Sequence, residues 1–347
     1  MTTQDVMADH FPTTEEAQIA ASSWAPAQII DSEEVGLRLS RMMAAELPAV
    51  PAGVFSTPAP PGSVVPSGPA GVGEAAPAMA AGTPSMPATM PVEQVRSLVT
   101  RLVRASQRVR KDHRQLTNAE RDLFNDALRQ AHGTREYKEL VDAHKDMSHR
   151  HHGTMPGMPP ESTQRFLPWH RAYGLKFEDL LRTVHPAVTV PYWDYANDHD
   201  RPDWVWQPSG VTRPTPGIRP NGNPTAALPT QATIDGLLQR PTFTAFTYGR
   251  VTGGSIRVDG LEMTAHNNVH DWCQGTLSNP MMSPEDPIFF MLHTNVDRIW
   301  DQWQLTHTGG PNITGADAGL DPWWTQAAGG LTADGVKDIT VLGYSYQ

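Results

Sequence analysis

The segment that says most about the fold is residues 261–303, LEMTAHNNVHDWCQGTLSNPMMSPEDPIFFMLHTNVDRIWDQW. His266 and His270 are four residues apart, so on a helix both imidazoles project from one face about one turn apart. A third histidine, His293, follows a Pro- and Met-rich loop that allows a second helix to fold back on the first. Converging neutral imidazoles are ligands for zinc, copper, iron or nickel. The segment therefore predicts a metal site between two helices.

The residues around these histidines distinguish between two interpretations, a buried metal site and two surface histidines on one helix. Large apolar residues flank His293 on both sides: Pro287, Phe289, Phe290, Trp300 and Trp303. This pattern indicates a buried histidine. The motif HNNVH lacks the glutamate that H-E-x-x-H uses as a general base, which argues against a zinc peptidase.

Charge and cysteine content limit the partners and the compartment. The 347 residues have a formal net charge of −10, which argues against a nucleic-acid partner or an anionic membrane surface. Cys273 is the only cysteine, so the fold cannot depend on an intrachain disulfide. The start, MTTQDVMADHF, has neither the basic region nor the apolar core of a secretory signal, and no apolar run is long enough to span a bilayer. We therefore expect a soluble protein without a signal peptide of its own.

Composition divides the chain near residue 92. Residues 1–50 are acidic, with a helix expected over residues 32–47, and residues 51–92 are almost entirely Pro, Ala, Gly and Ser. Such a segment cannot bury enough apolar surface to offset its loss of conformational entropy, so residues 1–92 are predicted to form a largely flexible extension. Its role is either that of a spacer or that of an arm that covers the site or recruits a partner.

Helical patterns dominate after residue 92. Apolar residues recur at helical spacing over residues 92–111, opposite a basic face that we expect to be solvated. Thr117 and Glu120 have the spacing of a capping box that starts a second helix. Further elements are predicted as follows: helices over residues 135–152, 164–184 and 234–239, a hairpin around residues 253–254, and an extended stretch over residues 337–347.

The embedded histidines form two sets of three. One set is His144, a member of the cluster His149, His151 and His152, and His170; the other is His266, His270 and His293. Three imidazoles per metal on paired helices suit a dinuclear centre in a helix bundle, and the Glu-x-x-His motifs of di-iron bundles are missing. Ligation by imidazole alone favours copper over iron or manganese, with zinc as the competitor.

Five motifs occur in order along the second part of the chain: FLPWHRAY (166–173), VPYWDY (190–195), HNNVHDW (266–272), DPIFFMLHTNVDRIW (286–300) and YSY (344–346). They resemble the motifs of the tyrosinase family of type 3 copper proteins, particularly those of its bacterial members. The resemblance implies that residues 93–347 form a tyrosinase-like copper-binding domain. It implies a mainly α fold, in which a four-helix-bundle core holds a dinuclear copper site among long irregular loops and few short strands.

The resemblance also assigns ligands. It makes His144 and His170 ligands of the first copper, and it gives the second copper His266, His270 and His293. The remaining ligand of the first copper is open, because the position nine residues before His170 is Glu161. We favour His152, which is followed by glycine as in relatives, and the alternatives are His151 and then His149.

Further roles follow from the resemblance. Phe289 is expected to stack over the site, and Asp297 to accept a hydrogen bond from a ligand imidazole or from Arg171, unless it forms an ordinary salt bridge of the bundle. Asn267 and Glu262 are the candidate pair that holds a water for deprotonating a monophenol. The tail residues Tyr344 and Tyr346 are expected to pack against Arg171.

The activity implied is oxidation of o-diphenols or o-aminophenols to o-quinones or quinone imines with O2 as co-substrate, and hydroxylation of monophenols as a tyrosinase would perform it. The substrate would be a small phenol or aminophenol or a peptidyl tyrosine, in melanin or secondary-metabolite biosynthesis. A partner protein could deliver copper and export the chain, which is otherwise expected in the cytoplasm. The alternatives are a haemocyanin-like dioxygen carrier and a zinc-binding bundle without oxidase activity.

Overall fold

The computed structural model describes residues 108–206, 225–252 and 255–347. The predicted N-terminal extension, with its helix over residues 32–47, lies outside these ranges. The helices that dominate the described part are α4 (Asn118–Ala131), α5 (Arg135–Lys145), α6 (Ser162–Arg182), α9 (Asn268–Cys273) and α10 (Ile288–Thr306). The predicted mainly α fold with a helical core is confirmed.

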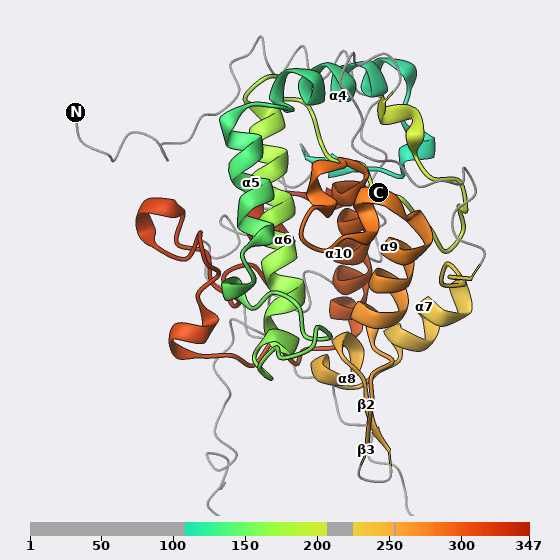
Figure 1. Ribbon diagram of the computed structural model, residues 1–347, viewed down its shortest axis with the longest axis vertical. Helices are drawn as coiled ribbons and strands as arrows, with labels where there is room; N and C mark the ends of the chain where they lie inside the picture. The colour runs from blue at the N-terminus through green and yellow to red at the C-terminus, as the bar shows by residue number, and fades with distance from the viewer. Residues whose placement is uncertain (1–107, 207–224, 253–254) are drawn as a thin grey trace, which may run out of the picture.

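The main helices are arranged around the contact between α6 and α10. Figure 1 shows α5 and α6 side by side, α10 and α9 beyond them, and α4 lying across their upper ends. Short helices fill the loops: α7 (Gln231–Leu238), α8 (Phe243–Thr247) and α11 (Ile339–Leu342). Single turns of 3-10 helix occur at residues 113–115, 147–149, 203–206, 275–278, 283–285, 315–318 and 326–328. No helix in the described ranges has the length and apolar character needed to cross a membrane.

Side-chain caps fix where the first core helices begin. The predicted capping box of α4 is confirmed: Thr117 accepts a hydrogen bond from the Glu120 amide at 3.2 Å, and Glu120 accepts one from the Thr117 amide at 2.7 Å. Thr134 caps α5 by accepting from the Tyr137 amide at 3.2 Å. Both caps satisfy amides that have no partner within the helix.

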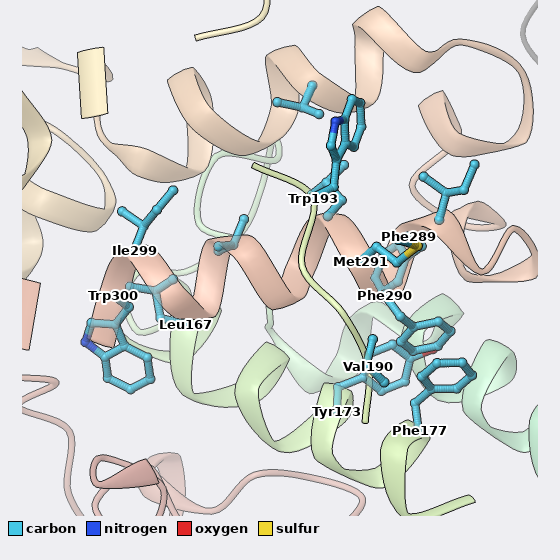
Figure 2. Close-up of a cluster of buried hydrophobic side chains, with 14 of the residues drawn as sticks. Leu167, Tyr173, Phe177, Val190, Trp193, Phe289, Phe290, Met291, Ile299 and Trp300 are labelled. Atoms are coloured by element: carbon cyan, nitrogen blue, oxygen red, sulfur yellow. The ribbon is translucent and has the colours of Figure 1, made fainter. Parts of the chain in front are cut away.

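Aromatic packing joins α6 to α10. The rings of Phe177 and Phe290 stack with centroids 3.6 Å apart, and the Tyr173 ring lies 5.4 Å from Phe290 (Figure 2). The segment that carries Val190 and Trp193 crosses this core, and the Trp193 amide donates to the Met291 carbonyl at 3.1 Å. This irregular segment therefore packs against the bundle.

Two short sheets complete the fold. Strands β2 (Arg250–Thr252) and β3 (Ser255–Arg257) pair antiparallel, which confirms the predicted hairpin. Strand β1 (Val109–Arg110) pairs in parallel with β4 (Ser345–Tyr346). The helix predicted through residue 111 is therefore wrong at its described end, because β1 obtains backbone hydrogen bonds from the C-terminal tail. The predicted extended tail is confirmed only in β4, since α11 precedes it.

A buried ionic network surrounds β1 and β4. Arg110, expected to be solvated, is 1% exposed; its Nε donates to Glu178 at 2.9 Å and its guanidinium lies 3.8 Å from the Tyr344 ring centroid. The tail tyrosines thus stack on Arg110, while the guanidinium of Arg171 lies over Trp300 and interacts electrostatically with Tyr344. Both tyrosine hydroxyls, Tyr344 at 2.6 Å and Tyr346 at 2.5 Å, donate to Asp297.

Candidate metal centre

The structure brings all six predicted metal ligands into one buried region between the core helices. Two groups of described histidines have ring nitrogens within 4.8 Å of one another and could each hold an ion: His144, His151 and His152, and then His266, His270 and His293. His170 joins the first group, because its Nε2 lies 3.4 Å from the Nε2 of His144. A seventh histidine, His151, which the sequence offered only as an alternative to His152, lies in the same cluster as His152.

A π-helical turn, Met263–Asn267, leads into α9 and shapes the second cluster. His266 lies in the wide turn and His270 in the following helix, so both rings face His293 on α10. The His293 Nε2 is 3.2 Å from the Nε2 of His266 and 3.4 Å from that of His270. The π-helical turn is a feature that the four-residue spacing alone could not predict, and such turns are frequent at functional sites.

Hydrogen bonds at the other ring nitrogen orient these imidazoles. The His270 Nδ1 lies 2.6 Å from the Leu277 carbonyl, and the His266 Nδ1 lies 2.7 Å from the Asn267 Oδ1. In the first cluster the His170 Nδ1 lies 2.8 Å from the Phe166 carbonyl. An acceptor at Nδ1 holds the proton there and leaves Nε2 as a lone-pair donor toward the centre.

His144 on α5 and His170 on α6 form the rigid part of the first cluster, and the loop after α5 supplies the rest. The His152 Nε2 is buried and has no hydrogen-bond partner in the described part of the chain, while its Nδ1 lies 3.6 Å from Glu262. Both His151 and His152 are within metal-ligating distance of His144, whereas His149 lies outside the cluster. The preference for His152 over His151 therefore stays a prediction, and His149 is disfavoured.

The two clusters adjoin one another directly. The rings of His170 and His293 stack with centroids 4.4 Å apart and an interplanar angle of 11°. Phe289, which is fully buried, lies 4.1 Å from the His293 ring and 4.9 Å from the His144 ring. It therefore stands against a histidine of each cluster, as the prediction that it stacks over the site requires.

The clusters are electrostatically suited to a cation. Burial, together with the neighbouring imidazoles, holds several pKa values well below the ordinary 6.5: those of His144, His151, His170, His266 and His293. Burial also lowers the pKa of His270, to about 4. The rings are therefore neutral near pH 7, the form in which imidazole binds metals. Facing ring nitrogens without protons between them fit two ions, and an all-imidazole donor set fits copper.

Glu262 and Asn267 lie beside the site, but protein groups already occupy most of their polar atoms. One carboxylate oxygen of Glu262, Oε1, accepts hydrogen bonds from the Gly153 amide at 2.8 Å, the Thr154 amide at 3.1 Å and the Thr154 hydroxyl at 3.0 Å. The Asn267 amide donates to the same hydroxyl at 2.9 Å. Thr154 thus connects the two residues, a role for which the sequence gives no signal because it depends on a loop conformation.

Comparison with known proteins agrees with this geometry. The model of the common central domain of tyrosinase matches residues 134–243 and 215–306, a region that contains all of the clustered histidines. A tyrosinase of Streptomyces lincolnensis is 28% identical over 256 residues, covering 62% of this chain and 92% of the relative. Grixazone synthase of Streptomyces griseus subsp. griseus is 26% identical over 301 residues, covering 64% of this chain and 95% of the relative.

Among solved structures, the polyphenol oxidase of Grenache grapevine, Vitis vinifera, is similar in fold, with a TM-score of 0.51 at 20% identity over 69% of this chain and 84% of that one. A helical core that presents two adjoining imidazole clusters defines a protein with a dinuclear metal centre. The chain belongs to the tyrosinase family of type 3 copper proteins. Membership implies a centre of two copper ions and an oxidoreductase activity.

Proposed function

We propose that the chain uses O2 to oxidise o-diphenols or o-aminophenols to o-quinones or quinone imines. The observation that carries the proposal is the pair of imidazole clusters that meet at the stacked rings of His170 and His293. When bound there, two copper ions supply the electron-transfer chemistry by which two o-diphenols, each giving up two electrons and two protons, reduce one O2 to two waters.

The protein groups have three tasks in this reaction. Three histidines would hold each ion: His144, His152 and His170 the first, and His266, His270 and His293 the second. Backbone carbonyls and Asn267 fix the orientation of the rings through Nδ1, so that little reorganisation is needed during turnover. Phe289 forms an apolar wall beside both clusters and excludes water from the space between them.

Oxygen consumption by the copper-loaded chain tests the proposal, with catechol, o-aminophenol and tyrosine offered in parallel. Uptake with catechol or o-aminophenol supports it. Reversible O2 binding without turnover would instead indicate a dioxygen carrier. A chain that retains zinc but no copper would indicate a bundle without oxidase activity, and either result would contradict the proposal.

A more specific hypothesis is that the chain also hydroxylates monophenols. It rests on Glu262, whose second oxygen, Oε2, is buried without a hydrogen-bond partner among the described residues and can accept a hydrogen bond from a water, and on Asn267 beside His266. Such a water could take the proton of a bound phenol. Glu262→Gln and Asn267→Ala should then reduce turnover of tyrosine more than that of catechol. Equal losses on both substrates would remove the hypothesis.

The physiological setting follows from the same proposal. The substrate would be a small phenol, an aminophenol or a peptidyl tyrosine, within melanin or secondary-metabolite biosynthesis. We also propose that copper comes from a partner protein and that the chain works in the cytoplasm or is exported with that partner. Fractionation of producing cells, with copper content measured in the presence and absence of co-purifying protein, tests both points.

A further inference from the structure

His151 is a buried histidine that is not among the six proposed copper ligands. Its side chain is 0% exposed, and neither of its ring nitrogens has a hydrogen-bond partner among the described residues. Burying polar atoms without partners is costly, so native proteins rarely leave them so. An aliphatic or aromatic side chain would fill this position without that cost. The imidazole therefore indicates a partner that the described part of the chain does not supply.

The conformation of the loop backbone places the rings of both His149 and His151 against Trp169. Arg150 between them has a left-handed conformation, with φ of 53°. The buried Arg165 side chain fixes this turn, because its Nε donates to the His149 carbonyl at 2.9 Å. As a result both rings stack on Trp169, that of His151 at 4.2 Å and that of His149 at 6.1 Å.

The rings on Trp169 form a series from the surface to the centre. The His149 side chain is 12% exposed, and its ring lies 6.4 Å from that of His151. The His151 ring lies in turn 4.8 Å from His144 and 4.6 Å from His152. Each step is short enough for an ion to be shared by successive imidazoles when the side chains move slightly.

His151 lies on the outer side of the first cluster. The rings of His152 and His170 face the second cluster, at 5.7 Å and 6.0 Å from the His266 ring. Among the described residues, the His151 ring makes ring contacts only with those of the first cluster, His149 and Trp169. A metal position made by His144, His151 and His152 is therefore displaced outward from one made by His144, His152 and His170.

We propose that His149 and His151 form a copper-uptake path that ends in a transit position made by His144, His151 and His152. This inference rests on the proposed function. It explains why the first cluster has four imidazoles although three suffice to hold one ion. Transfer inward is a ligand exchange in which the bond to His151 breaks as the bond to His170 forms. The exchange replaces one imidazole ligand by another, so it moves no electron and changes no oxidation state.

Copper uptake by the metal-free full-length chain tests the path. The decrease of tryptophan fluorescence after rapid mixing with copper gives the rate, and copper per chain after desalting gives the end point. His151→Phe keeps a ring on Trp169 but removes both donors, and His149→Phe does the same at the outer position. His185→Phe is the matched control, because His185 pairs with Asp126 at the far end of α6.

We expect every variant to reach two coppers per chain. His151→Phe and His149→Phe should load about tenfold more slowly than wild type, and His185→Phe should load at the wild-type rate. Metal-free His151→Phe should unfold at or above the wild-type temperature, because it removes two buried nitrogens that have no partner.

Three results would overturn the path. A His151→Phe chain that stops at one copper would make His151 a permanent ligand. Unchanged loading rates for both variants would leave His149 and His151 without a part in uptake. A marked loss of stability in metal-free His151→Phe would reveal a structural role. If wild type itself binds no copper, the proposed function fails instead, so the two failures are distinguishable.

Discussion

Arg171 and Asp297 form a buried ion pair that connects α6 to α10. Arg171 directly follows His170, and Asp297 lies one helical turn after His293, so the pair fixes the spacing of the helices that carry one histidine of each cluster. Burial alone would raise the pKa of Asp297, but Arg171 and Arg110 outweigh it and lower that pKa. The carboxylate is therefore charged, and the predicted contact with Arg171 is confirmed.

Asp297→Asn should destabilise the chain strongly. The substitution would remove the carboxylate acceptor of Arg171 and leave that guanidinium as a buried charge without its main counterion. We expect the free energy of unfolding of the metal-free chain to fall by about 3–5 kcal/mol, measured by urea unfolding. The control is Glu139→Gln, which removes an exposed ion pair with Arg135 and should cost no more than about 0.5 kcal/mol. Similar losses for both variants would contradict the buried role.

Glu178 should make stability depend on acid pH. Burial would raise its pKa, but Arg110 and Arg108 lower it below the ordinary 4.5. Because its pKa is lower in the folded chain, its contribution is fully present above pH 4.5 and is lost as the pH falls through the folded value. Wild type should therefore exceed Glu178→Gln by about 3 kcal/mol in unfolding free energy at pH 7, and by progressively less below pH 4.5.

Comparing the two chains at each pH cancels the titration of the histidines, which both contain. Urea unfolding of the metal-free proteins between pH 7 and pH 3 gives the difference. A difference that stays constant over this range would show that the charge of Glu178 is not what stabilises the fold.

Features that depend on neighbouring residues could be predicted from the sequence. Most of the features that were not predicted depend on contacts between segments far apart in the sequence. The capping box at Thr117 and the four-residue spacing of His266 and His270 depend on neighbours in sequence, so they could be predicted. Strand β1 could not, because its partner β4 lies at the other end of the described chain. Apolar residues at helical spacing predict a helix, but backbone hydrogen bonds to a distant segment can stabilise a strand instead.

The residues of the site show the same distinction between local and long-range features. The histidines on α6 and α10 were predicted because motifs and helical spacing fix their direction. The preference for His152 over His151 rests on the resemblance alone, because both residues follow Arg150, whose left-handed conformation no spacing rule anticipates. The bridging role of Thr154 was missed for the same reason, since it requires the loop to fold back onto Glu262.

Thr154 should control how firmly copper is held. Its hydroxyl bridges Glu262 and Asn267, and Asn267 orients His266. Thr154→Val keeps the volume but removes the bridge, so copper affinity should fall about 10- to 100-fold, measured by competition with a chelator. Thr154→Ser restores the hydroxyl and should recover most of the affinity. Equal affinity in the valine and serine variants would refute the bridge.

Gly153 should be intolerant of any side chain, because the loop passes close to Glu262 at this residue. A Cβ there would lie 3.0 Å from the Glu262 Oε2 and 3.0 Å from the Thr163 Cα, which is backbone of α6 and cannot rotate away. Gly153→Ala should therefore displace the loop that carries His152, destabilise the metal-free chain by about 1–3 kcal/mol and weaken copper binding.

Gly174→Ala is the matched substitution, because a Cβ at this position in α6 meets no atom within 4 Å. Alanine restricts the unfolded chain and favours helix, so this variant should gain about 0.5–1 kcal/mol in unfolding free energy and keep its copper affinity. The opposite signs separate a steric effect at the loop from a general effect of adding a methyl group. If Gly153→Ala were as stable as wild type and bound copper equally well, the loop could shift freely, and Glu262 would not be what fixes His152.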